Sequence, residues 1–427
     1  MFKVLVISYY FPPMGLSGVQ RTLKFTKYLK QYNWEPTVLT SDYTAYYAYD
    51  DTLLKEADEA GIRIIRVKGD EINAMFRKKG TVKMPAEWLR KLLSRLSAMI
   101  FIPDNKAGWS NKAIKTAREL LSKEEYDMIF VSAPPFSSVN MAVKLKKEFN
   151  LPLVVDYRDL WYGNHFGFYP TPMHSYLHKK MEYSALKAAD RIIVINRRMK
   201  EKILNRYRFI TFDDIFIIPQ GFDPQDFSDL IPEKKNVKKM RLTYSGLFYE
   251  FITPKYFLKA FKKLSLERPD IAANIELHFI GLLRNENRKL IRKLDIQDFV
   301  REHGYLDHKS SLIKLISSDV LWLMVGDRRN SDTISTGKAF EYLGSRKPVI
   351  ACVPDGAVRT AMEEYGASFV TSPYDINDIK KAIKQAYELF VKGELPVPNE
   401  EFVEKHRRDY LTEQLTKQFQ FLIKAEI

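Results

Sequence analysis

The sequence predicts an α/β protein with two doubly wound parallel sheets that face a cleft, and three observations support this prediction. The chain has 427 residues, more than one hydrophobic core usually serves, which favours two domains of about 200 residues each. Short apolar runs without strict polar alternation recur along it, as expected for strands buried on both faces. The strand and helix rhythm stops once, in a polar and charged stretch at residues 222–241, which is the expected domain linker.

The first half of the chain is expected to form an N-terminal domain over residues 1–225. It opens with an apolar strand at residues 3–8, which a proline-marked turn joins to a helix at about 18–32. Further apolar runs predict the other strands of this sheet: residues 35–40, 63–67, 128–132, 153–156, 191–195 and 215–218.

The second domain is expected over residues 240–400, where the same rhythm starts again with a helix at 254–268. Its predicted strands are residues 241–245, 275–280, 300–303, 320–324, 348–353 and 368–371. The last segment, residues 402–427, carries no strand signal and predicts a helix. This helix either caps its own domain or crosses back to the first one.

Composition indicates a folded protein without disulfides. Hydrophobic residues make up 45% of the chain and aromatic residues 13%, which excludes global disorder. The single cysteine, Cys352, lies in a predicted strand and is expected to be a buried thiol, so a cytosolic setting is favoured. No run reaches the roughly 18 apolar residues of a membrane span, and residues 2–8 predict a strand instead of a signal peptide. We therefore expect the protein to remain inside the cell.

The net charge of +15 indicates an anionic partner, which could be nucleic acid, a membrane surface or a phosphorylated substrate. Residues 76–101 mix cations with apolar and aromatic residues at helical spacing, as in a helix that lies on an anionic membrane. The alternative is a helix packed on the sheet with a solvated basic face. No nucleic-acid-binding module surrounds the segment, so nucleic acid is not the expected partner.

The strongest candidate for a binding site is a helix start late in the second domain. Ser335 or Thr336 can cap this helix, and Gly337 lets the backbone approach a ligand closely. Amides at a helix start attract phosphate oxygens, and Lys338 adds a positive charge on the same face as Glu341. Glu341 offers two acceptor oxygens to the hydroxyl pair of a ribose. The pattern predicts a nucleotide diphosphate site; the alternative is an amphipathic helix with a solvated lysine and a surface ion pair.

Two other places at predicted strand ends are expected to face the cleft. The turn at residues 9–21 contains Gly18, which permits close approach of a sugar or phosphate. This turn lacks the glycine spacing of dinucleotide sites, which disfavours NAD, and its alternative is a simple tight turn. After the strand at 153–156, Arg158 and Asp159 could orient substrate hydroxyls or pair with each other.

No metal site is expected. His174 and His178 stand four residues apart, but no third ligand completes a metal motif there, and a surface or packing role is favoured. The chain also contains no Asp-x-Asp triplet, which disfavours a sugar-nucleotide enzyme built on a carboxylate-held metal.

Short motifs along nearly the whole chain resemble those of a known family. They are residues 10–13 (YFPP), 18–21 (GVQR), 23–25 (LKF), 34–36 (WEP), 102–104 (IPD), 156–161 (DYRDLW), 221–223 (GFD), 244–246 (YSG) and 337–343 (GKAFEYL). With them the chain resembles the glycosyltransferases of the GT-B fold, specifically the family 4 type, which uses nucleotide sugars and retains anomeric configuration.

The resemblance implies an acceptor-binding first domain, a nucleotide-sugar-binding second domain and a C-terminal helix that crosses back to the first domain. It implies that Lys338 contacts the diphosphate, Glu341 the ribose, and Gly18 the donor phosphates and sugar, while Gly246 opens the first loop of the nucleotide domain. Catalysis in such enzymes needs no metal or other cofactor, because cations and helix amides stabilise the leaving diphosphate. The implied reaction is hexosyl transfer to a lipid-linked or polysaccharide acceptor, in polysaccharide or lipopolysaccharide assembly, by a cytoplasmic enzyme at the inner face of the membrane.

The chain departs from the family pattern at three positions. The first of two glutamates usual in the family is replaced by Thr333, and the adjacent Asp332 could contact the donor sugar instead. The usual basic residue soon after Gly246 is absent, and Lys255 or Arg284 could supply that charge. The usual first-domain histidine has no counterpart, and Arg158 or Asp159 occupies its region. The expected catalytic residues are therefore Arg158, Asp159 and Asp332.

Two other functions remain open at this stage. A sugar-nucleotide epimerase of the same two-domain architecture would change its sugar without an acceptor. A non-catalytic basic protein would instead use its charge on a membrane or on nucleic acid, and nucleic-acid binding would weaken steeply with salt.

Overall fold

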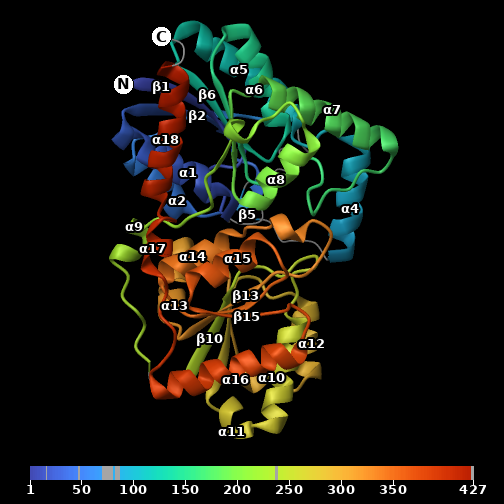
Figure 1. The fold of residues 1–427 in the computed structure, drawn as a ribbon, viewed down its shortest axis with the longest axis vertical. Coiled ribbons are helices and arrows are strands. Elements are labelled where there is room, and N and C mark those ends of the chain that lie inside the picture. Colours follow the sequence, from blue (N-terminus) through green and yellow to red (C-terminus); the bar gives the residue numbers. More distant parts are fainter. Residues whose placement is uncertain (16, 47–48, 70–79, 82–86, 236–238, 425–427) are drawn as a thin grey trace. The chain divides into compact units, whose positions relative to one another are not determined.

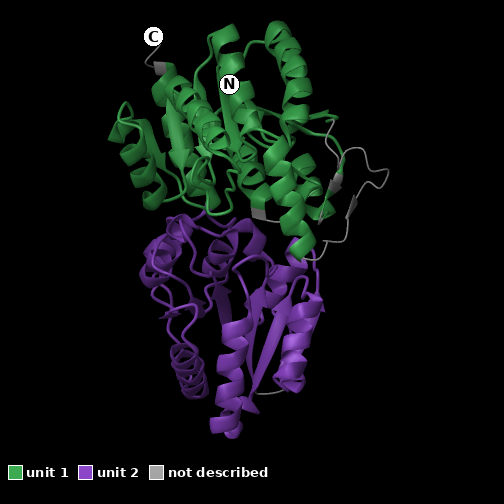
Figure 2. Cartoon of the chain, turned by 90° about the vertical axis from the view of Figure 1, so that its right-hand side faces the viewer, with its two compact units in different colours: residues 1–220, 408–427 green, residues 221–407 purple. Residues whose placement is uncertain are grey.

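A computed structural model describes residues 1–15, 17–46, 49–69, 80–81, 87–235 and 239–424. The chain forms two compact units (Figure 2): unit 1 comprises residues 1–220 and 408–427, and unit 2 comprises residues 221–407. Each unit is a parallel sheet with helices between successive strands (Figure 1). No helix among the described residues combines the length and the apolar character that crossing a membrane requires.

Unit 1 contains a seven-stranded parallel sheet in the order β4-β2-β1-β6-β7-β8-β9. Its strands are β1 (Phe2–Ile7), β2 (Trp34–Ser41), β4 (Arg63–Val67), β6 (Met128–Ala133), β7 (Leu153–Tyr157), β8 (Arg191–Val194) and β9 (Ile215–Ile217). Its described helices are α1 (Ser17–Leu29), α2 (Asp51–Glu59), α4 (Glu87–Ile100), α5 (Ala107–Lys123), α6 (Ser137–Phe149), α7 (Pro172–Ala188), α8 (Arg197–Arg206) and α18 (Arg408–Lys424). Every strand predicted for this domain is confirmed within one or two residues. The small pair β3 (Ala45–Tyr46) and β5 (Gly80–Thr81) was not predicted.

Unit 2 contains a six-stranded parallel sheet in the order β12-β11-β10-β13-β14-β15. Its strands are β10 (Met240–Ser245), β11 (Ile275–Ile280), β12 (Val300–Gly304), β13 (Val320–Met324), β14 (Val349–Cys352) and β15 (Ser368–Thr371), all as predicted within one or two residues. Its helices are α9 (Gln225–Ser228), α10 (Lys255–Glu267), α11 (Pro269–Ala272), α12 (Asn285–Lys293), α13 (His308–Ile316), α14 (Gly337–Ser345), α15 (Ala357–Tyr365), α16 (Ile376–Lys392) and α17 (Glu400–Glu404). Cys352 is fully buried in β14, as expected.

The strand order of each sheet contains one switch point. In unit 1, the first strand β1 lies between β2 and β6; in unit 2, the first strand β10 lies between β11 and β13. The connections that leave the two neighbouring strands at this point run in opposite directions. This leaves an open crevice beyond the carboxyl ends of the strands. Ligands of open α/β sheets bind at these crevices, so both units have the expected position for one.

The C-terminal helix α18 belongs to unit 1 and packs on α1 (Figure 1). Leu411, Leu415 and Phe419 join the hydrophobic core of that unit. The Phe419 ring lies 5.0 Å from the ring of Trp34 and 5.6 Å from that of Phe130. Of the two arrangements that the sequence allowed, the helix that crosses back to the first domain is therefore the correct one.

The stretch that the sequence predicted as a linker begins with a residue that packs in unit 2. Phe222 is 4% exposed in the core of unit 2, and its amide donates to the carbonyl of His406. The chain passes from unit 1 to unit 2 at Gln220 and returns at Arg408, and the Arg408 guanidinium donates to the Gln220 side chain. The two crossings of the chain thus lie side by side.

Candidate functional site

The predicted site in unit 2 begins at the amino terminus of α14. Thr336, not Ser335, is the N-cap: its backbone is extended and its hydroxyl accepts from the amide of Ala339. The helix follows β13 and the loop after it, so its first turn lies at the switch point beside β10. Helix amides that point toward this crevice favour an anion.

Lys338 lies over the aromatic end of β10. Its Nζ donates to the Tyr244 hydroxyl at 2.8 Å and stands 4.6 Å from the centre of that ring. Tyr244 is itself buried and stacks on Phe248 with ring centres 4.1 Å apart. Burial lowers the pKa of Lys338 to about 8, and the charge of Glu341 one turn later opposes this shift. The lysine is thus held in place, and a bound phosphate would stabilise its charged form.

Gly246, the residue directly after β10, makes this position of Lys338 possible. Its φ is +133°, and a Cβ there would lie 2.4 Å from Cε and 2.5 Å from Nζ of Lys338. Its carbonyl in turn lies against Gly281, the first residue after β11, where a Cβ would approach that oxygen to 2.6 Å. Both residues have a positive φ, which favours glycine, and a Cβ at residue 246 would displace the end of the Lys338 side chain from this position. The sequence predicted Gly246 and Lys338 as site residues separately; the structure brings them into direct contact.

Glu341 is half-buried one turn after Lys338, on the same face of α14. The next residue, Tyr342, fixes the helix to the sheet: its hydroxyl accepts from the Ser245 amide at 2.9 Å and donates to the Trp322 carbonyl at 3.2 Å. Sequence reasoning missed this role of Tyr342, because an apolar helix position does not reveal which strand ends its hydroxyl reaches. The two bonds set the distance of Lys338 and Glu341 from the ends of β10 and β13.

Asp332 lies in a short 3-10 helix (Ser331–Thr333) between β13 and α14. The turn after β14 packs on its backbone, since a Cβ on Gly356, whose φ is +142°, would lie 2.5 Å from the Asp332 Cα. Thr333, which replaces the expected glutamate, is 5% exposed and donates its hydroxyl to the Asn330 carbonyl at 3.0 Å. Thr333 therefore closes its own turn, and Asp332 is the carboxylate that this segment offers.

The two cations considered as substitutes for the missing basic residue differ in position. Arg284 caps α12 after the loop that follows β11, with a side chain 14% exposed and its guanidinium 3.6 Å from the Glu286 carboxylate. Lys255 opens α10, and its Nζ lies 5.4 Å from the Tyr256 ring. Arg284 follows the loop after β11, the neighbour of β10, whereas Lys255 stands at the end of the loop that Gly246 opens.

In unit 1, Arg158 is buried and engaged with the backbone. Its guanidinium donates to the carbonyls of Gly18, Pro134 and Ala133, and so ties the start of α1 to the turn after β6. This geometry gives Arg158 a positioning role at the switch point of unit 1. A Cβ on Gly18 would reach only the Arg158 Nη1, at an ordinary 3.5 Å. Packing within unit 1 therefore does not require glycine at residue 18.

Asp159 is half-buried beside Arg158. In the part of the chain that the structure describes, no ion pair joins these two side chains. Burial raises the pKa of Asp159 to about 6, against the lowering effect of the Arg158 charge. A carboxyl group of this kind can gain or release a proton near neutral pH.

An ion pair that sequence reasoning did not identify joins the motifs at residues 18–21 and 156–161. Arg21 and Asp156 are both fully buried, with Nη2 and Oδ1 2.7 Å apart. Arg21 further donates to the carbonyls of Ile218 and Pro219, and Ser132 donates to Asp156. The pair fastens α1 to the ends of β6, β7 and β9. Its signal in the sequence was an arginine in the first predicted helix and an aspartate at a predicted strand end, which does not by itself specify a partner.

The histidines considered for metal binding take part in ordinary hydrogen bonds. The Nδ1 atom of His178 accepts from the Trp161 indole at 3.1 Å. His174 bonds to the Thr171 hydroxyl through Nδ1 and to the Met99 carbonyl through Nε2. These contacts support the packing role that the sequence favoured.

The chain is similar to known proteins in sequence over its first half and in structure over its whole length. Residues 17–226 match the family model described as Glycosyltransferase Family 4. No curated protein matches the chain in sequence. Three solved structures illustrate the likeness in fold: a glycosyltransferase from Rickettsia africae ESF-5 (17% identity, 99% of each chain, TM-score 0.65), Anabaena Alr3699/HepE in complex with UDP-glucose (11% identity, 98% of this chain and 100% of that one, TM-score 0.61), and WaaG, a glycosyltransferase involved in lipopolysaccharide biosynthesis (13% identity, 96% and 98%, TM-score 0.60).

Proposed function

Since the chain belongs to glycosyltransferase family 4 through residues 17–226 and has the GT-B fold, we propose that it transfers a sugar from a nucleotide diphosphate sugar to a lipid-linked or polysaccharide acceptor, with retention of configuration. The main support for the proposal is the position of Lys338 at the start of α14, where its side chain contacts Gly246 and Tyr244. The UDP-glucose complex of the Anabaena protein supports this donor class. The role of WaaG in lipopolysaccharide biosynthesis supports an acceptor in cell-surface glycan assembly.

In unit 2, each donor group has a proposed partner. Lys338 and the first amides of α14 bind the diphosphate and stabilise its charge as it leaves. Glu341 accepts from the ribose hydroxyls, and Asp332 contacts the donor sugar in place of the missing glutamate. Gly246 and Gly337 let the backbone approach the phosphates closely.

In unit 1, we assign Gly18 to the donor phosphates and sugar and Asp159 to the acceptor hydroxyl. Arg158 acts through its bonds to the backbone, which hold the start of α1 beside the turn after β6. The hydroxyl that attacks must lose its proton, and a carboxyl group with a pKa of about 6 can share that proton near neutral pH.

A thermal-shift screen with UDP-glucose, UDP-galactose, UDP-N-acetylglucosamine and GDP-mannose tests the donor class. A donor at one hundred times its Kd adds about 2.7 kcal/mol of stability to the fold. We expect at least one donor to raise the Tm, and Lys338→Ala and Glu341→Ala to abolish that rise. The proposal is wrong if none of these donors raises the Tm, or if both variants keep the rise of the wild type. Product analysis with donor alone separates transfer from epimerisation, because an epimerase would release a changed sugar without an acceptor.

We also propose that α4 holds the protein on an anionic membrane surface. Its apolar side chains are exposed instead of packed on the sheet: Trp88 (69%), Leu92 (48%), Leu93 (52%), Leu96 (46%), Met99 (55%) and Ile100 (72%). Lys91 and Arg95 are exposed on the same helix and would pair with lipid phosphates, at about 1 kcal/mol for each cation. Each apolar side chain contributes up to about 1.5–3 kcal/mol when it enters the lipid. Residues 76–79 and 82–86 of the predicted membrane segment lie outside the described residues.

Flotation with phosphatidylglycerol vesicles tests this contact. We expect the wild type to float with the vesicles, and the double variant Leu92→Glu with Leu96→Glu to remain in the soluble fraction. Leu266→Glu, at a leucine 70% exposed on α10 in unit 2, is the matched control and should float like the wild type. Equal flotation of all three proteins would show that α4 is not the contact.

A further inference from the structure

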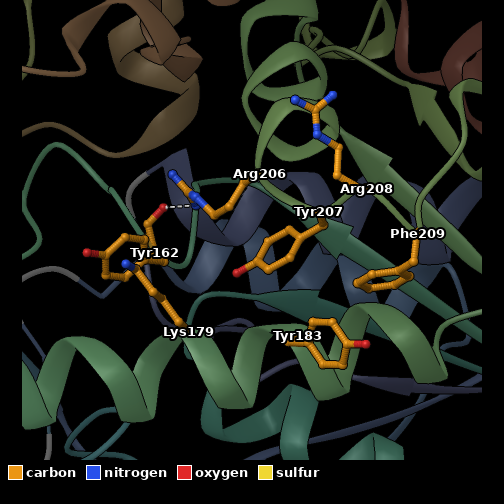
Figure 3. A pocket seen from close by; sticks show the side chains of 7 residues that line it. All are labelled: Tyr162, Lys179, Tyr183, Arg206, Tyr207, Arg208 and Phe209. Atoms are coloured by element: carbon orange, nitrogen blue, oxygen red, sulfur yellow. Dashed lines mark hydrogen bonds between the residues drawn. The ribbon is translucent and has the colours of Figure 1, made fainter.

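A pocket of about 620 Å³ in unit 1 has no role in the chemistry proposed above (Figure 3). It lies between α7 and the end of α8, wholly within this unit. The residues that line it are Lys179 and Tyr183 from α7, Arg206 from the end of α8, Tyr207, Arg208 and Phe209 directly after it, and Tyr162 from the loop after β7. Its volume is within the range of about 300–1,000 Å³ that is typical of ligand sites.

One end of the pocket carries ordered positive charge around an aromatic ring. The Nζ of Lys179 lies 4.8 Å from the centre of the Tyr162 ring, and the Arg206 guanidinium lies 4.9 Å from it. Nη1 of Arg206 donates to the Tyr162 carbonyl at 2.6 Å, which Figure 3 marks with a dashed line. The Tyr162 hydroxyl is bonded to Ser175 at 2.8 Å. These contacts hold the ring and the guanidinium in place before any ligand arrives.

The other end is an aromatic surface. The rings of Tyr183 and Phe209 meet edge to face at 4.7 Å, and Tyr207 lies 6.3 Å from Tyr183. Tyr183 is 44% exposed and Phe209 39%, although both are large and apolar. Arg208 is also exposed, and in Figure 3 its guanidinium points away from these rings. Exposed aromatic rings gathered in this way mark a binding surface.

A buried carboxyl group bonds to residues that line the pocket but does not line the pocket itself. Glu182 is fully buried; it accepts from the Tyr207 hydroxyl and from the Tyr162 amide, and its carboxylate lies 3.4 Å from Arg206. Burial raises the pKa of Glu182. The seven described residues that line the pocket include no carboxylate, so the wall itself presents three cations and four aromatic rings.

We propose that this pocket binds an acidic sugar residue of a glycan. Aromatic faces pack against the apolar face of a sugar ring, and arginine and lysine bind carboxylate or phosphate oxygens through charge-assisted hydrogen bonds. An anionic sugar would give Lys179 and Arg208 a counter-ion, which a neutral sugar would not, and a simple anion would leave the aromatic surface uncovered. The combination fits a uronate or a sugar phosphate, and the volume admits a short oligosaccharide.

The glycan site is independent of the donor chemistry, so its test uses different probes. Isothermal titration with trigalacturonate and with glucose 6-phosphate separates the carboxylate from the phosphate, and maltotriose is the neutral control. We expect at least one anionic probe to bind and maltotriose to bind at least tenfold more weakly. The thermal shift with UDP-glucose, measured on the same proteins, reports separately whether the donor site works.

Three variants locate the binding. Arg208→Ala and Phe209→Ala change exposed side chains, so both proteins should fold, and each should weaken the anionic probe at least tenfold. Lys187→Ala, at an exposed lysine of α7 outside the pocket, is the matched control and should bind like the wild type. The proposal is wrong if neither anionic probe binds at millimolar concentration, if both pocket variants bind like the wild type, or if maltotriose binds equally well. It is also wrong if a short RNA competes at these residues with higher affinity than either probe, because the occupant would then be nucleic acid.

Discussion

Gly246→Ala tests the contact on which the donor site depends. The new Cβ would lie 2.4 Å from Cε of Lys338, and Cβ atoms do not approach other heavy atoms more closely than 3.0 Å, so the lysine must move away by about 0.6 Å or more. That movement breaks its 2.8 Å bond to Tyr244 and removes its ammonium from the diphosphate position. A hydrogen bond to a charged group contributes about 1.5–3 kcal/mol, which corresponds to roughly ten- to hundredfold weaker donor binding. The positive φ adds strain of about 1–3 kcal/mol, visible as a lower Tm.

Isothermal titration with UDP-glucose measures the loss, and two further proteins identify its cause. If Gly246→Ala acts through the lysine, the double variant Gly246→Ala with Lys338→Ala should bind no more weakly than Lys338→Ala alone. Gly393→Ala is the matched control for backbone strain, because Gly393 has a φ of +73° and a Cβ there meets no atom within 4 Å. It should lower the Tm and leave donor affinity unchanged. Wild-type affinity in Gly246→Ala, or fully additive losses in the double variant, would refute the reasoning.

Four other predictions follow from the same geometry. Because burial holds the pKa of Lys338 near 8, donor affinity should fall as pH rises from 7 to 9, and titration of Lys338→Ala should show no such fall. Asp159→Asn should stabilise the protein above pH 6 by about 1–2 kcal/mol in urea unfolding. The reason is that between about pH 4 and 6 the carboxyl group of the folded wild type keeps a proton that the unfolded chain has lost. Equal stabilisation at pH 3.5 would argue against this cause. Arg21→Met should cost about 3–5 kcal/mol by leaving a buried carboxylate without its partner, whereas Arg197→Met, at a side chain 84% exposed, should change stability by less than about 0.5 kcal/mol. Gly18→Ala should unfold like the wild type and still lose activity, because its Cβ has room within unit 1; retained activity would remove Gly18 from the site.

Most of the strands could be predicted closely because they are short apolar runs buried on both faces, a pattern that depends on few other features. The edge strands β4 and β12 are only partly buried. The pair β3 and β5 was missed because two residues on each side carry no periodic signal. The stretch at residues 222–241 was predicted to be a linker from its polarity, yet Phe222 packs in the core of unit 2. The position of α18 stayed open because its apolar stripe could cover either sheet, and its contacts with Trp34 and Phe130 decide between them.

The candidate site was predictable where one segment contains the whole signal. The cap, glycine and lysine at residues 336–338 lie together in the sequence, and a capped helix start at a strand end has a known affinity for anions. The contact of Lys338 with Gly246 joins residues that lie 92 positions apart, and nothing local specifies it. The contact of Arg158 with substrate stays a prediction, and its hydrogen bonds to backbone carbonyls could not be read from the sequence.

The return of α18 to unit 1 makes that unit discontinuous in the chain, with unit 2 as an insertion between its two parts. During synthesis, Trp34 and Phe130 leave the ribosome long before the ring of Phe419 that covers them, so the first unit must wait with part of its core exposed while the whole second unit emerges. Unit 2, whose residues are contiguous, can fold as soon as they are available. Truncation of the last 20 residues should therefore damage the amino-terminal unit and spare the one adjacent to the cut.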